Sequence, residues 1–170
     1  SDKEQAAPTY KKGFGFFPIG VWLDNTKEAL AGILRPGNAG ANTGSDHVRA
    51  LNLALEQLPV SPRGIDPLNG VAMLARADSA GASHDFVKAL RRRGIEYSVG
   101  FDVTEAVRLG ILELPKTAWV EAIDQDCEVR DGAQVAELTD YLDLSTWPEG
   151  TRAIVRREEP HPGAQFSLFD

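Results

Sequence analysis

The chain contains one cysteine, one methionine and three histidines, and none of its apolar runs approaches the length of a membrane span. The single cysteine, Cys127, excludes an intrachain disulfide framework and a multi-cysteine zinc site, and it is typical of a reducing cytoplasm. Crossing a bilayer needs roughly 20 apolar residues, and the charged start of the chain is unlike a signal peptide. The sequence therefore predicts a soluble, cytoplasmic protein.

Basic residues are outnumbered, since 18 Lys and Arg stand against 25 Asp and Glu and the formal net charge is -7. Non-specific affinity for nucleic acid comes mainly from Lys and Arg that neutralise phosphates. A protein that coats nucleic acid by charge alone is therefore excluded. Short basic clusters occur at residues 11–12, 91–93 and 156–157. They are typical of solvated surfaces and helix ends, although a local DNA contact stays open.

The hydrophobic pattern predicts an α/β fold with strands before and after the helices. Two apolar runs around the turn cluster 24–27 predict an antiparallel hairpin. The glycine-rich loop 35–44 precedes a predicted helix, which Thr43 or Ser45 can cap and whose apolar stripe runs from Val48 to Leu58. Because the hairpin is followed by crossover connections, we expect a mixed sheet.

The second half of the chain changes from alternating strands and helices to short strands. Residues 95–101 predict a strand, and Asp102 with Glu105 has the spacing of a capping box for the next helix, which Pro115 ends. Beyond Lys116 we expect a β-rich tail. Its short alternating runs lie at residues 119–123, 135–138, 153–156 and 165–169.

The most informative stretch lies between residues 71 and 94. An apolar run ends at Asp78, small residues follow, and Ser83 is a predicted N-cap for a helix that Gly94 ends. In open α/β sheets, ligands and metals bind beyond the carboxyl ends of strands, where Asp78 is expected. An aspartate in this position also commonly accepts hydrogen bonds from turn amides. Both interpretations stay open from spacing alone.

Seven strings together resemble DDE transposases of bacterial insertion sequences, in the DDE domain group 1 subfamily. The loop Arg35-Pro-Gly-Asn-Ala-Gly40 is the most specific of them, and the resemblance covers nearly the whole chain. The strings span residues 11–18, 30–44, 76–83, 97–102, 122–126, 135–138 and 154–157.

The resemblance implies a ribonuclease-H-like mixed sheet with helices that is incomplete, because the family's first strand would precede Ser1. That strand lies between the second and fourth strands in this fold. Residues 1–115 would form a partial catalytic core, and residues 116–170 would begin a β-rich insertion packed in the same domain. The implied function is metal-dependent phosphodiester cleavage and strand transfer on the terminal repeats of mobile DNA. The resemblance allows a homodimer in the transposition complex.

Such enzymes hold two metal ions, Mg²⁺ or Mn²⁺, with two aspartates and one glutamate, because one ion activates the attacking oxygen and the other stabilises the leaving oxygen. Asp78 matches the second aspartate and is the expected catalytic residue and metal ligand. The first aspartate would precede Ser1 and the glutamate would follow Asp170. The isolated chain is therefore expected to be inactive.

Other polar residues have plainer interpretations. Asp24 is predicted to be a turn residue, and Glu158 and Glu159 adjoin prolines in a predicted loop, so none of the three is assigned to the metal. His84 could contact a phosphate or a water, or lie on the surface. Asn38 and Asn42 could meet phosphate or stabilise a turn. The three tryptophans are expected to anchor the core or the sheets, namely Trp22, Trp119 and Trp147.

Two alternatives remain. The chain could be a degenerate, non-catalytic module that binds nucleic acid or protein, in which case it would lack metal affinity. It could also be an unrelated α/β enzyme that uses Asp78 with Asp102 or Asp124, which requires these carboxylates to lie within metal-bridging distance.

Overall fold

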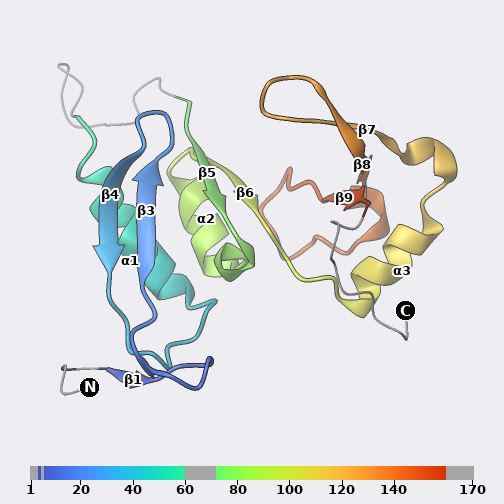
Figure 1. The fold of residues 1–170 in the computed structure, drawn as a ribbon. Helices are drawn as coiled ribbons and strands as arrows, with labels where there is room; N and C mark the ends of the chain where they lie inside the picture. Colours follow the sequence, from blue (N-terminus) through green and yellow to red (C-terminus); the bar gives the residue numbers. More distant parts are fainter. Residues whose placement is uncertain (1–3, 5, 60–71, 160–170) are drawn as a thin grey trace. The chain divides into compact units, whose positions relative to one another are not determined.

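The computed structural model of the chain describes residue 4, residues 6–59 and residues 72–159. The chain forms two compact units, residues 1–102 and residues 103–170 (Figure 1). The predicted mixture of α and β structure is confirmed, with three α-helices and several small sheets among the described residues. No helix in these ranges is long and apolar enough to cross a membrane.

The first unit begins with two antiparallel strand pairs. The pair β1 and β2 is short, and the hairpin β3 and β4 is the one predicted around the turn at residues 24–27. Gly20 lies opposite Gly32 in this hairpin, and the Trp22 side chain lies over Gly20. The bounds are β1 Ala7–Pro8, β2 Phe14–Gly15, β3 Ile19–Leu23 and β4 Glu28–Ile33.

A parallel pair and two helices complete the first unit. Helix α1 packs against β3, β4 and α2, and α2 packs against β6. One helical layer therefore covers the β3–β4 pair and the β5–β6 pair. Its apolar core contains Leu51, Phe86, Leu90 and Ile95. The bounds are α1 Gly44–Leu55, β5 Leu74–Ala77, the 3₁₀ turn η1 Ser79–Gly81, α2 His84–Arg92 and β6 Glu96–Val99.

The strands of the first unit form separate sheets rather than the single mixed sheet that we expected. Strand β5 pairs in parallel with β6, and β3 pairs antiparallel with β4. Within the described ranges, no ladder joins β3 to β5. These two strands therefore each keep one unpaired edge.

A buried arginine holds the loop between β4 and α1. Arg35 is 5% exposed, and its Nε donates to the carbonyl oxygen of Phe17 at 3.1 Å. Its Nη1 donates to the carbonyl oxygen of Gly40 at 2.8 Å and to Oδ2 of Asp46 at 3.2 Å. The guanidinium also lies over the Phe17 ring, 4.9 Å from its centroid. One side chain thus joins the strand entry, the loop and the first turn of α1.

The second unit is a three-stranded antiparallel sheet, ordered β7-β8-β9, with one α-helix. Its core contains Val107 of α3, Leu114, which directly follows α3, and Ala136 and Leu138. At the end of β8, Glu137 accepts hydrogen bonds from Arg152 and Thr139, which hold the pKa of Glu137 below its usual range. The bounds are α3 Glu105–Glu113, η2 Lys116–Ala118, β7 Val120–Ile123, β8 Val129–Glu137, η3 Thr139–Tyr141 and β9 Ile154–Glu158.

Three local predictions need correction. The N-cap of α3 is Thr104, whose hydroxyl accepts from the N–H of Val107 at 3.4 Å, so the predicted capping box at Asp102 is wrong. Helix α1 ends at Leu55, before Leu58; Thr43 is its N-cap, one of the two predicted positions, but its side chain makes no capping hydrogen bond. Glu158 ends strand β9 and does not lie in a loop. Residue 71 and the run at 165–169 lie outside the described residues.

The division of the chain into residues 1–115 and 116–170 stays a prediction. The compact units divide between Asp102 and Val103, and α3 contributes to the core of the second unit. The compact units are defined by contacts between residues. The predicted division instead follows the domain boundaries that the family resemblance implies.

We expect Arg35→Ala to lower the free energy of unfolding by about 3 kcal/mol, because it removes one partner of a partly buried ion pair, the donor to the carbonyl oxygen of Phe17 and one of two donors to the carbonyl oxygen of Gly40. Urea denaturation of the chain measures this change. Arg91→Ala is the matched control, because its ion pair with Glu96 is largely exposed and should contribute at most about 0.5 kcal/mol. Equal losses in the two variants would contradict the role of Arg35.

Candidate active site at the end of strand β5

Asp78 follows the last residue of β5 and caps the turn η1. Its Oδ1 accepts a hydrogen bond from the N–H of Ala80 at 3.0 Å, and its side chain is exposed. No described residue donates to Oδ2. The carboxylate is therefore oriented through one oxygen while the other can bind a ligand.

Small residues bring the chain close to Asp78. A Cβ at Gly81 would lie 2.5 Å from the Cβ of Ala77, so the turn after β5 requires glycine there. After β6, the N–H of Gly100 donates to the carbonyl oxygen of Ala77 at 3.1 Å, and a Cβ at Gly100 would lie 3.2 Å from the backbone nitrogen of Ser79. The two parallel strands thus end side by side. In open α/β sheets, ligands bind beyond the carboxyl ends of such strands.

The first turns of α1 and α2 meet near this end of the unit. A Cβ at Gly44 would lie 2.9 Å from the Cβ of Asp85 and 3.0 Å from Oγ of Ser83. The predicted N-cap is confirmed, because Oγ of Ser83 accepts from the N–H of Phe86 at 3.3 Å. Gly94, with φ of 69°, follows the end of α2 as predicted.

His47 is a residue whose role the sequence did not indicate. It is 9% exposed, and its Nδ1 lies 3.0 Å from the carbonyl oxygen of Thr43. A carbonyl oxygen only accepts, so Nδ1 carries a proton here. The ring packs against Phe86, with centroids 5.4 Å apart. His47 thus stabilises the contact between α1 and α2.

Asp24 lies in the β3–β4 turn, as predicted. It pairs with Lys27, and its Oδ2 lies 3.9 Å from Nη1 of Arg76. The hydrogen bond from Lys27 is the main cause that lowers the pKa of Asp24. Because β3 runs opposite to β5, the turn after β3 lies at the other end of the unit from the carboxyl end of β5 (Figure 1).

Two of the remaining carboxylates already have partners within the second unit. Glu158 is held by Arg130 at 3.0 Å and by Arg156 at 3.4 Å. Oδ1 of Asp124 accepts backbone N–H groups of the β7–β8 turn. Among residues 6–59 and 72–159, no group of three or more His, Cys, Asp or Glu could hold a metal ion. The alternative in which Asp78 acts with Asp102 or Asp124 stays a prediction.

The other polar candidates lie in the expected elements. His84 is the exposed first residue of α2, and Asn38 and Asn42 lie in turns of the loop before α1. Their contacts with phosphate or water stay predictions. Trp22 lies on the sheet but is 63% exposed, whereas Trp119 packs against the core of the second unit.

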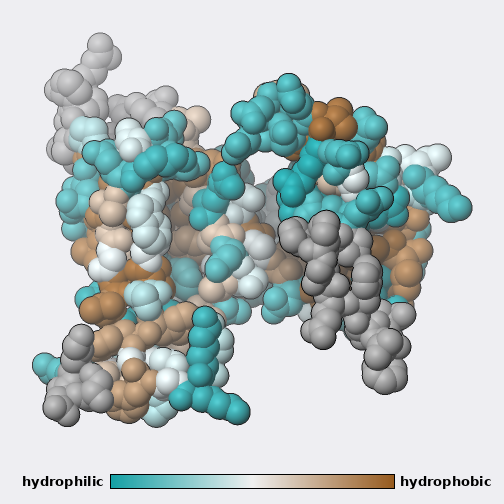
Figure 2. Space-filling model, in the orientation of Figure 1, coloured by the Kyte–Doolittle hydropathy of each residue, from teal (hydrophilic) through white to brown (hydrophobic). Residues whose placement is uncertain are grey.

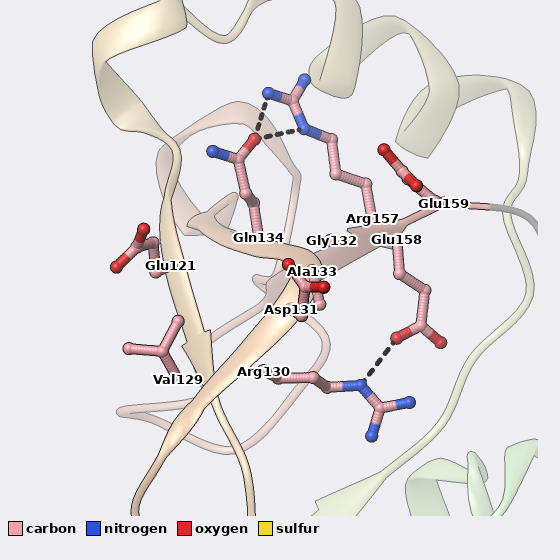
Figure 3. Close-up of a pocket in the computed structure, with 10 residues that line it drawn as sticks. All are labelled: Glu121, Val129, Arg130, Asp131, Gly132, Ala133, Gln134, Arg157, Glu158 and Glu159. Carbon is pink, nitrogen blue, oxygen red and sulfur yellow. Dashed lines mark hydrogen bonds and ion pairs between the residues drawn. The ribbon is translucent and has the colours of Figure 1, made fainter.

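A recess of about 430 Å³ lies on the sheet of the second unit (Figure 3). Its charged groups include four carboxylates and two arginines, and Asp78 is not among them. We therefore do not assign the transposition chemistry to it. It is lined by Glu121, Val129, Arg130, Asp131, Gly132, Ala133, Gln134, Arg157, Glu158 and Glu159.

Comparison with known protein families decides the relationship. The family described as transposase DDE domain group 1 matches residues 1–169. The chain belongs to this family of DDE transposases. No curated protein and no solved structure gives a significant match. The family acts on DNA in transposition and generally uses a divalent metal, so the resemblance seen in the sequence is confirmed at the level of the family.

The cap at Asp78 allows its structural and chemical roles to be separated. We expect Asp78→Ala to lower the free energy of unfolding by about 1 kcal/mol, because the N–H of Ala80 loses its acceptor. Asp78→Asn keeps an acceptor oxygen and should change the free energy of unfolding by only a few tenths of a kcal/mol. Urea denaturation measures both variants. A loss in Asp78→Asn as large as in Asp78→Ala would contradict the capping role.

Proposed function

We propose that this chain is the central part of the catalytic domain of a DNA transposase, which cleaves phosphodiester bonds at mobile-element ends and transfers the strands. We further propose that Asp78 is one of its metal ligands. The observation that carries the proposal is an exposed carboxylate at the carboxyl end of a parallel strand, in a chain that matches the DDE family over residues 1–169.

Asp78 fits a divalent metal as one ligand of a larger set. Its carboxylate offers hard oxygen, which Mg²⁺ and Mn²⁺ prefer, and Oδ1 is already oriented by the N–H of Ala80. When bound, such ions supply charge stabilisation at the attacking and leaving oxygens. The described residues do not complete the ligand set. We propose that the other two acids lie outside this chain and that the isolated chain does not cleave DNA.

The unpaired edges of β3 and β5 support a ribonuclease-H-like fold with one more strand between them. Both strand pairs pack against the same helical layer, and β3 and β5 are the inner strands of the two pairs (Figure 1). Exposed strand edges leave N–H and C=O groups without partners, which folded proteins usually cover. One extended strand could satisfy both edges at once.

The surroundings of this gap suit one apolar strand. A strand with neighbours on both sides needs about 10 Å between them. Asp24 directly follows β3, whereas Arg76 lies on β5 in a different sheet, and Oδ2 of Asp24 is 3.9 Å from Nη1 of Arg76. The two side chains together are long enough to reach each other across a gap wide enough for one strand. Trp22 and Leu74 are 63% and 61% exposed on the strands that border it. Figure 2 shows apolar residues exposed over β3 and β4 on the face opposite α1.

The entry of the chain indicates the direction of that strand. A Cβ at Gly37 would lie 2.4 Å from the carbonyl oxygen of Ala7, so β1 lies against the loop that leads into α1. The first residue of α1, Gly44, is at the end of the unit where α2 begins after Asp78. A strand that leads into β1 would end there and run parallel to β5. An acid at its carboxyl end would then lie near Asp78.

We expect a six-residue strand of Val, Ile and Thr, fused ahead of residue 1, to slow amide hydrogen exchange in β3 and β5 by roughly tenfold or more, because it pairs with both edges. Hydrogen exchange followed by NMR measures this. A fusion with two prolines in the inserted strand is the control, and amides of β8 are an internal reference. Unchanged exchange in β3 and β5, or equal slowing by the proline fusion, would contradict the proposed strand.

The catalytic proposal is tested in a polypeptide extended on both sides of residues 1–170. We expect Asp78→Asn to reduce Mg²⁺-dependent cleavage of transposon ends by at least about 100-fold, because the variant keeps the cap but loses the anionic ligand. Asp24→Asn is the matched control, since it removes an exposed turn carboxylate at the other end of the first unit. A gel assay with labelled DNA ends measures cleavage.

The outcomes separate the two candidate functions. Cleavage that survives in Asp78→Ala would overturn the assignment of Asp78. DNA or protein binding by the extended polypeptide without any Mg²⁺-dependent cleavage would favour the non-catalytic module. Cleavage by the isolated 1–170 chain would contradict the proposal that two acids lie outside it.

A further inference from the structure

The arginines of the second unit differ in how their charge is compensated. Four of them form ion pairs with carboxylates, whereas Arg157 has no carboxylate oxygen within 4.0 Å among the described residues. The paired arginines are Arg108 with Glu105, Arg130 with Glu158, Arg152 with Glu137 and Arg156 with Glu158. Arg157 therefore presents an uncompensated positive charge on an exposed side chain.

Neutral groups hold Arg157 in place. Its guanidinium carbon lies 3.9 Å from the centroid of the Trp119 ring, and Trp119 packs against the core of the unit. Its Nε and Nη2 both donate to Oε1 of Gln134, at 3.0 Å and 2.5 Å (Figure 3). Gln134 and Arg157 are direct partners in the β8–β9 register. The plane of the guanidinium is thus fixed from one face and one edge.

This arrangement leaves most of the guanidinium available. A guanidinium has five N–H donors, and Gln134 accepts from only two nitrogens, so both N–H groups of Nη1 keep their hydrogen-bonding capacity. Stacking and the bond to Gln134 restrict the side-chain rotation that an anion would otherwise have to restrict on binding. A planar fork of this kind matches the oxygens of a phosphate.

The carboxylates that line the recess with Arg157 form no ion pair with it. Glu158 is paired with Arg130 and Arg156. The carboxylates of Glu121, Asp131 and Glu159 lie more than 4.0 Å from the Arg157 nitrogens. Because the whole chain is acidic, a phosphate contact must depend on a directed donor rather than on net charge.

We propose that Arg157 binds a phosphate of the DNA backbone and so positions the DNA on the β-rich unit. This inference rests on the proposed function, since it takes DNA as the ligand. Trp119 and Gln134 act on the DNA only through Arg157, which they hold in the binding geometry. The stack also joins β9 to the residue before β7, so a purely structural role predicts changes in stability without changes in DNA binding.

The test measures how DNA affinity depends on salt, using the extended polypeptide of the cleavage assay and a labelled duplex. We expect Arg157→Gln to weaken binding roughly tenfold and to reduce the slope of log affinity against log salt by about 0.9, the value for one lost phosphate contact. Arg157→Lys keeps the charge and should restore the slope. Arg130→Gln, which removes an ion-paired arginine from the same sheet, is the control and should leave the slope unchanged.

The results distinguish this inference from the proposed function. An unchanged slope in Arg157→Gln, with thermal unfolding showing a folded protein, would overturn the role of Arg157 and leave the catalytic proposal intact. Equal reductions of the salt slope in Arg157→Gln and Arg130→Gln would also overturn it. The loss would then reflect the total positive charge of the sheet and not a contact made by Arg157. Absence of DNA binding by the unsubstituted polypeptide would overturn both proposals.

Discussion

The buried guanidinium of Arg35 is the interaction on which the first unit depends. A charge that is 5% exposed cannot be left without partners, and its partners come from the strand entry, the loop and the first turn of α1. These three segments must therefore be placed together. The glycine-rich loop is irregular, yet its ends are fixed, and α1 begins at one position relative to the hairpin.

The position of Asp78 follows from this placement through close contacts of small residues. Gly44 at the start of α1 allows the first turn of α2 to approach, and Gly81 allows the turn after β5 to close against Ala77. Each contact leaves no room for a Cβ without a shift of its neighbour. Fixed backbone around an exposed carboxylate supports the proposal that Asp78 binds a metal ion, because a ligand displaced by about 1 Å loses much of its effect.

The sequence predicted the features whose signals are local. Ser83 caps α2 and Asp24 lies in a turn, since each uses partners within three residues. The cap of α3 was assigned to Asp102 because its spacing to Glu105 suits a capping box, but Thr104 stands directly before the helix. Arg35 and His47 could not be predicted, because Arg35 bonds Phe17 and His47 packs against Phe86, both far away in the sequence. The end of a strand predicts Asp78 as a candidate ligand, and this role stays a prediction.

An acidic chain that acts on an acidic polymer needs cations or directed donors at the points of contact. Carboxylates grouped for metal binding repel each other and the phosphates until divalent ions occupy them, so the acids of such a centre are compatible with DNA only when the metal is bound. Away from the metal, net charge gives no attraction in a chain of net charge -7. Affinity must then come from individual groups whose charge is not already paired. Arg157 meets this requirement because an indole ring and an amide oxygen, rather than a carboxylate, hold it in place.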